Sequence, residues 1–92
     1  MNKYVIERTI PGAGKLGPAD LADVSAKSAS VLRELGPDVQ WVNTFVCADK
    51  LYCIYNAKSA EIVREHALRA GIPADSINQV VAVVDPTGVQ TR

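Results

Sequence analysis

The chain has 92 residues, below the most common domain size of about 100 to 150, so we expect one domain without a separate cofactor module. Its 48% hydrophobic and 22% charged residues indicate a packed core and exclude a disordered protein. Ten Lys and Arg balance ten Asp and Glu, and without a basic excess to attract a phosphate backbone we expect no nucleic-acid partner.

The first part of the chain predicts a strand, a loop and a helix. Tyr4–Ile10 is rich in β-branched and aromatic residues, which predicts a strand that Pro11-Gly12 ends. A glycine-rich loop over residues 12–17 follows. Apolar residues then recur every three or four positions over Pro18–Leu35, which predicts an amphipathic helix that Gly36-Pro37 ends.

The middle of the chain predicts a hairpin and a second helix. Val39–Cys47 and Leu51–Ala57 have the composition of strands, and the polar break between them is short enough for an antiparallel hairpin. Ser59 then supplies an N-cap hydroxyl for a helix that Gly71 and Pro73 end.

The last strand pattern, Ile77–Asp85, is stopped by Pro86. We therefore expect a single domain over residues 1–86 and a flexible tail over residues 87–92. The resulting order, βαββαβ, predicts an α+β ferredoxin-like fold, a four-stranded antiparallel sheet with both helices on one face. Two cysteines cannot supply the four thiolates of an iron–sulfur cluster, so the prediction concerns topology alone.

The fourth strand also predicts an assembly. Val80–Val84 is apolar at every position, as expected for a strand that is buried on both faces. Because two helices cover only one face of the sheet, we expect the other face to form a two-fold homodimer interface. A monomer with an apolar open face is the alternative.

The length of the same run indicates whether the chain can cross a membrane. At five residues it is the longest apolar run, whereas a membrane span needs about 20. The N-terminal residues lead directly into a strand pattern and lack the apolar segment of a signal peptide. We therefore expect no membrane partner and a cytoplasmic location.

His66 is the only histidine of the chain. It shares the apolar stripe of the second helix with Ile62, Val63 and Ala67, so it should point toward the sheet. A buried imidazole satisfied by one hydrogen bond explains this position, and so does a metal ligand or proton carrier. One histidine cannot form an all-histidine zinc site, so a metal would need a carboxylate, a thiolate or a second chain.

Cys47 and Cys53 flank the predicted hairpin loop. A three-residue loop places both thiols on one face, and a two-residue loop places them on opposite faces. Neither register brings their Cα atoms within about 7 Å, the limit for a disulfide, so we expect free thiols. Cys53 is then either a small buried hydrophobe or a soft metal ligand.

Further polar candidates lie on the predicted strands. Glu7 and Arg8 are neighbours, so one points to each face, and each needs a partner unless it is exposed near the strand end. Arg8 and polar-tipped residues of the hairpin would suit the lining of a small pocket, although aromatic residues are more often buried in a core. These hairpin residues are Trp41, Asn43, Tyr52, Tyr55 and Asn56.

Several segments together resemble a known family. They are Tyr4–Arg8 with Pro11-Gly12, Trp41–Val46, Tyr52–Ala57, and His66-Ala67 with Ala70–Pro73. They resemble a small bacterial domain-of-unknown-function family that includes a nickel-responsive, nickel-binding protein. The resemblance covers nearly the whole chain and implies a dimeric α+β barrel of ferredoxin-like subunits, with nickel or another divalent transition metal as the leading ligand. The matching polar positions are Glu7, Arg8, Trp41, Tyr52, Cys53, Tyr55 and His66.

Three functions are compatible with these features. A metal-binding protein would use His66 with Glu7 or Cys53, because imidazole, carboxylate and thiolate all accept Ni(II). The dimeric α+β barrels that the chain resembles include small monooxygenases and isomerases. An enzyme of that kind would use His66 as general base and Tyr52 or Tyr55 to orient a substrate in a cleft between sheet and helices. A structural or interaction dimer without a small-molecule site is the third hypothesis.

Overall fold

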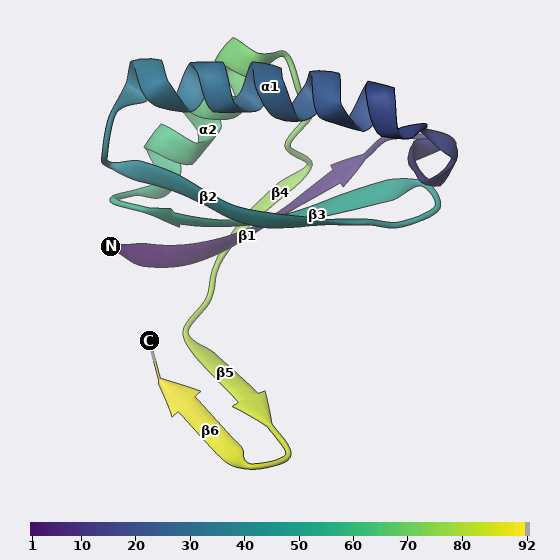
Figure 1. Ribbon diagram of the computed structural model, residues 1–92. Coiled ribbons are helices and arrows are strands. Elements are labelled where there is room, and N and C mark those ends of the chain that lie inside the picture. The colour runs from purple at the N-terminus through teal and green to yellow at the C-terminus, as the bar shows by residue number, and fades with distance from the viewer. Residues whose placement is uncertain (92) are drawn as a thin grey trace.

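The structure is a computed structural model that describes residues 1–91. Two helices lie against one face of a sheet, and a separate hairpin follows at the C-terminal end (Figure 1). A short 3-10 helix, η1, precedes the first α-helix. The elements in chain order are β1 (Asn2–Thr9), η1 (Ala13–Lys15), α1 (Pro18–Leu35), β2 (Val39–Val46), β3 (Lys50–Ala57), α2 (Ala60–Ala70), β4 (Ser76–Gln79), β5 (Ala82–Asp85) and β6 (Gly88–Thr91).

The four-stranded sheet has the order β2-β3-β1-β4, and each strand pairs antiparallel with its neighbours. The predicted α+β ferredoxin-like fold is therefore confirmed. None of the helices within the described residues is long and apolar enough to cross a membrane.

Strand alternation places the core between the sheet and the helices. Ile6 of β1 lies opposite Cys53 of β3, and Tyr4 lies opposite Tyr55, so these residues share the face toward the helices. All four are buried, and Val63 of α2 belongs to the same apolar cluster. Because side chains alternate along a strand, the intervening residues point to the open, outer face.

The β2–β3 hairpin settles the register around the cysteines. Cys47 donates its backbone N–H to the Lys50 carbonyl over 2.8 Å, and Val46 pairs with Leu51, so the loop consists of two residues. Cys47 and Cys53 consequently lie on opposite faces, the first exposed and the second buried, and both thiols are free.

A β-bulge interrupts β2 at Val42. Trp41 pairs with Tyr55, and Asn43 pairs with Ile54, so Val42 is the extra residue. The bulge reverses the alternation of side chains along the strand. Trp41 and Thr44 therefore both face the helices, whereas Asn43 faces outward.

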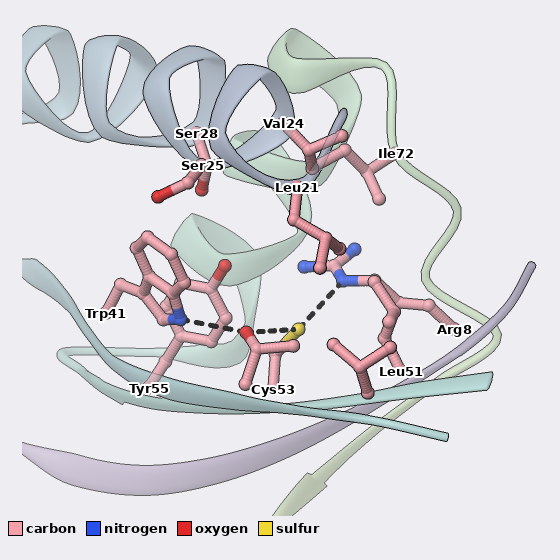
Figure 2. Close-up of a pocket in the computed structure, with 12 residues that line it drawn as sticks. Arg8, Leu21, Val24, Ser25, Ser28, Trp41, Leu51, Cys53, Tyr55 and Ile72 are labelled. Atoms are coloured by element: carbon pink, nitrogen blue, oxygen red, sulfur yellow. Dashed lines mark hydrogen bonds between the residues drawn. The ribbon is translucent and has the colours of Figure 1, made fainter. Parts of the chain in front are cut away.

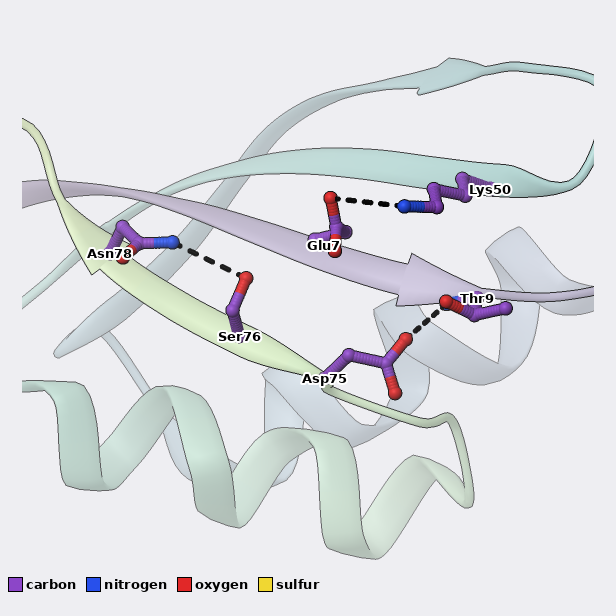
Figure 3. Close-up of polar contacts among 6 residues, drawn as sticks. All are labelled: Glu7, Thr9, Lys50, Asp75, Ser76 and Asn78. Atoms are coloured by element: carbon purple, nitrogen blue, oxygen red, sulfur yellow. Dashed lines mark hydrogen bonds and ion pairs between the residues drawn. The ribbon is translucent and has the colours of Figure 1, made fainter.

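The predicted fourth strand is wrong in its length. Val80 donates its N–H to the Lys3 carbonyl over 2.8 Å, and β1 begins one residue earlier, so little of β1 is left to pair with the following residues. At the other end of β4, Asp75 accepts a hydrogen bond from the Thr9 backbone N–H, while Glu7 forms an ion pair with Lys50 on the outer face (Figure 3).

The rest of the apolar run forms one strand of a hairpin. Ala82–Asp85 pairs with Gly88–Thr91, so described residues of the expected tail form a strand; Arg92 lies outside the described residues. Asp85, Pro86 and Gly88 occupy positions that these residue types favour in a β-turn, and the Asp85 carboxylate accepts the Thr87 N–H over 2.8 Å. The proline expected to end a strand thus belongs to the turn.

This hairpin stands away from the sheet and helices (Figure 1). Its valines are exposed, Val84 by 69% and Val89 by 67%. The burial of Val80–Val84 on two faces, from which a homodimer was expected, does not occur within the chain.

Candidate functional site: a pocket between α1 and the sheet

A pocket of about 190 Å³ lies between α1 and the inner face of the sheet. Figure 2 shows its lining side chains converging from both layers. Most of the lining is apolar, which suits an organic ligand more than a hydrated ion. α1 contributes Leu21, Val24, Ser25 and Ser28; the sheet contributes Arg8, Trp41, Thr44, Val46, Leu51, Cys53 and Tyr55; and Ile72 follows α2.

Small residues on α1 make room for the pocket. Ser25 and Ser28 are three positions apart and therefore lie on one side of the helix, where both line the space. Trp41 and Tyr55 lie across from them (Figure 2). Larger side chains at the two serine positions would fill this volume, so the pocket depends on their small size.

A chain of hydrogen bonds runs along the pocket floor (Figure 2). Trp41 Nε1 donates to Thr44 Oγ1 over 3.0 Å, and Thr44 Oγ1 donates to Cys53 Sγ over 3.2 Å. Arg8 Nε donates to the same sulfur over 3.4 Å. Together these bonds hold the tryptophan, the thiol and the guanidinium in fixed relative positions.

Arg8 is the most unusual residue of the site because its charged side chain is 0% exposed. Nη1 donates to the Pro73 carbonyl over 2.6 Å, but Nη2 has no hydrogen-bond partner within residues 1–91. The ion pairs found in this part of the chain do not include Arg8. A buried guanidinium thus lies in the pocket wall without a direct ion pair in the described chain, and the exposed Asp75 carboxylate interacts with its charge only from beyond ion-pair distance.

His66 lies behind the pocket, not in its wall. It is 0% exposed, and its Nε2 lies 3.0 Å from Ser28 Oγ and 3.4 Å from the Ser28 carbonyl oxygen. Its Nδ1 has no partner in the described structure. Burial lowers the pKa of His66, and the Ser28 carbonyl only partly opposes this, so the imidazole is neutral near pH 7.

Tyr55 connects His66 to the pocket. Its ring lies 5.3 Å from the imidazole, centroid to centroid, with the planes inclined at 55°. Burial raises the pKa of Tyr55, although the positive charge of Arg8 opposes the shift, so the phenol keeps its proton at neutral pH. The pocket therefore contains one cationic group and a neutral phenol.

The three predicted metal ligands do not converge within one chain. Glu7 is on the outer face of the sheet, 3.5 Å from Lys50 Nζ, whereas Cys53 is on the inner face (Figure 3). His66 Nε2 already contacts Ser28. The described residues contain no group of three His, Cys, Asp or Glu side chains that could hold a metal ion. This donor set therefore does not fit a transition metal inside a single subunit.

The predicted pocket residues are divided between the two sheet faces. Arg8, Trp41 and Tyr55 line the pocket, but Asn43 and Tyr52 do not. Tyr52 pairs with Glu7 and so points outward, and the bulge at Val42 turns Asn43 the same way. The expectation that Asn43 and Tyr52 line the pocket is thus corrected.

The sequence interpretation missed the serines of α1. Their signal was present, because Ser25 and Ser28 interrupt the apolar side of a helix at positions three apart. Thr44 was missed for a different reason. Only the bulge brings Thr44 to the inner face, and the sequence of β2 contains no signal that predicts the bulge.

The fold and site define an α+β ferredoxin-like protein with a small apolar pocket under its first helix. A family model described as "Nickel responsive protein SCO4226-like" matches residues 4–80, and the chain belongs to this family. The family predicted from the resemblance is thus confirmed. The match ends where the chain leaves the four-stranded sheet.

A solved structure supports the fold. The crystal structure of SCO4226 from Streptomyces coelicolor A3(2) is similar with a TM-score of 0.72 and 21% sequence identity, over 85% of this chain and 94% of that one. Comparison with curated proteins gives no match.

Proposed function

We propose that this protein binds a small, mainly apolar organic molecule in the pocket between α1 and the sheet. The observation that supports the proposal is the pocket itself, a space of about 190 Å³ with apolar walls and a few fixed polar groups. An apolar cavity of about 150 Å³ is already large enough to take up benzene. The volume therefore suits a molecule of one ring with a short substituent.

A fragment screen tests this proposal. A library of single-ring acids, amines and neutral compounds is added to 15N-labelled protein, and backbone amide shifts are followed by NMR. We expect binders to shift the amides of pocket residues such as Ser28 and Tyr55. Ser25→Phe should abolish these shifts by filling the space, whereas Ser30→Phe, on the exposed side of α1, should preserve them. A library without a single pocket binder would contradict the proposal.

We also propose that the protein associates with nickel, and membership of the nickel-responsive family supports this. Because Glu7, Cys53 and His66 do not converge in one chain, we expect a nickel site to use other donors or donors from two chains. His66→Gln should consequently leave the bound nickel unchanged, as measured by elemental analysis after dialysis.

Two results of that measurement would contradict these expectations. If His66→Gln removes the nickel, His66 is a ligand after all and its contact with Ser28 must open. If the wild-type chain retains no nickel, the association itself is rejected. The enzymatic alternative with His66 as general base is not favoured, because the imidazole does not line the pocket.

We further propose that two chains associate through the outer face of the sheet. Val42 is 49% exposed and Phe45 is 57% exposed on β2, where β-strand residues of a monomer are more often polar. The partly buried Val5 and Ile54 extend this apolar surface across β1 and β3. The helices cover the opposite face, so a second chain can reach the outer one.

A further inference from the structure

We propose that the pocket ligand is a carboxylic acid with a short apolar body, bound as its carboxylate by Arg8. This inference rests on the proposed function and specifies its ligand. It is carried by the charge and the hydrogen-bond state of Arg8. The apolar walls of the pocket then define the rest of the molecule.

Arg8 has no direct ion-pair partner among the described residues. Arg8 carries a positive charge at 0% exposure, and its observed partners, a sulfur, a backbone carbonyl and more weakly the Tyr55 phenol, are all neutral. Burying a charge is costly unless an opposite charge or a full set of hydrogen bonds compensates it. No carboxylate of the described chain pairs with Arg8. An anionic ligand would supply the compensation.

Nη2 of Arg8 is a hydrogen-bond donor without an observed acceptor in the described chain. Nη2 is buried and has no hydrogen-bond partner in the described part of the chain, while Nε and Nη1 are both occupied. Nη2 therefore keeps N–H groups without an acceptor on a residue that lines the pocket. Charge-assisted hydrogen bonds from arginine to a carboxylate are among the strongest in proteins. A single guanidinium also matches the single charge of a carboxylate better than a phosphate dianion.

The apolar lining around Arg8 indicates what the rest of the ligand should be. Around Arg8 the pocket is lined by the aliphatic Leu21, Val24, Leu51 and Ile72 (Figure 2). The small volume leaves space for one ring or a branched chain beside the carboxylate. Leu21 lines the same pocket as Arg8 and is only partly buried, so we expect a change of its rotamer to open a path for the carboxylate to Nη2.

Matched ligands test the carboxylate directly. Phenylacetate, phenylacetamide and phenethylamine have the same ring and differ in charge. We expect phenylacetate to bind wild-type protein at least about tenfold more tightly than phenylacetamide, measured by NMR titration, since the amide accepts a hydrogen bond but carries no charge opposite to that of Arg8. Phenethylamine should bind most weakly.

Variants assign this preference to Arg8. Arg8→Met keeps a long apolar side chain and should reduce the ratio of acid to amide affinity to about one. Arg8→Lys keeps the charge and should restore part of the preference, which also covers the case that Arg8→Met fails to fold. Arg64→Met removes an exposed arginine of α2 and should leave the ratio unchanged.

The outcomes separate the two proposals. Equal affinity for phenylacetate and phenylacetamide in wild-type protein, or a preference for phenethylamine, would overturn the carboxylate inference and leave the pocket function in place. A preference for the acid that persists in a folded Arg8→Met would overturn the role of Arg8. If no fragment of the larger library binds the pocket, both proposals fall together.

Discussion

The core of this small domain contains a few buried polar side chains. Arg8, Ser28 and His66 are polar and buried, in a chain whose other buried residues are largely apolar. Ser28 links the pocket to the buried imidazole, because it lines the pocket and its hydroxyl contacts His66 Nε2. Changes at these three positions should therefore affect the pocket and the stability together.

The buried imidazole predicts a pH dependence of stability. The pKa of His66 is lowered in the folded protein, while in the unfolded chain it is near 6.5. Below pH 6.5 the unfolded state consequently binds more protons than the folded state, so the free energy of unfolding should fall as the pH drops from 7.5 to 5.5. Urea denaturation at several pH values measures this dependence.

His66→Gln is the control for that experiment, because it keeps a polar group beside Ser28 but does not titrate. The chain has no other histidine, so the loss of stability between pH 7.5 and 5.5 should be smaller in this variant. An identical loss in both proteins would mean that His66 is not the group responsible.

At the scale of elements, η1 is attached to the β2–β3 loop. Gly14 donates its N–H to the Ala48 carbonyl over 3.0 Å, and Gly12 donates to the Asp49 carboxylate over 2.9 Å. A Cβ at position 14 would lie only 3.0 Å from Ala48 Cα and 3.1 Å from the Cys47 carbonyl oxygen. Both neighbours are backbone atoms, so neither can rotate away.

Gly14→Ala should therefore destabilise the protein by about 1–3 kcal/mol, as overpacking commonly does. Thermal unfolding followed by circular dichroism measures the effect. Gly17→Ser is the control, because its Cβ would have Asp20 Oδ2 as nearest atom, at 3.9 Å, and serine is a good N-cap residue. Equal stability of the two variants would show that η1 moves away from the loop without cost.

Most of the elements could be predicted from local signals, and the exceptions have physical reasons. The glycine and proline that flank α1 mark its ends, and the bounds predicted for this helix agree with the structure. No glycine or proline directly follows the end of β4 at Gln79. This end depends on where β1 begins, which is a property of two strands far apart in the chain. The run over 80–84 has strand character throughout, so its division required knowledge of the partner strand.

At the scale of the whole molecule, the protein has two unequal faces. The helices cover one side of the sheet, while the outer side has exposed apolar residues on β2. The β5–β6 hairpin adds further exposed valines away from this sheet, on the side opposite the helices (Figure 1). A two-stranded hairpin is at best marginally stable alone, so a second chain would also stabilise this segment.

The proposed dimer predicts a change of mass. Phe45→Lys places a charge on the outer face of the edge strand β2, where an unpaired charge is costly once buried. Light scattering during gel filtration should show twice the 9.9 kDa chain mass for wild-type protein and the chain mass for this variant. Leu68→Lys, at a residue of α2 that is 74% exposed, should keep the wild-type mass. A wild-type chain that elutes at 9.9 kDa would contradict the dimer.

The sequence by itself determined the order of the elements as far as β4, the fold class and the family, because hydrophobic period, turn residues and short motifs are local properties. It also singled out Arg8, Trp41, Tyr55 and His66. Only the tertiary structure decided which of these share a site. Side chains alternate along a strand, so one bulge at Val42 and a two-residue loop assign each residue of the hairpin to a face. The pairing of Glu7 with Tyr52 separates Glu7 from Cys53, and the packing of α1 over the sheet places Ser28 between His66 and the pocket.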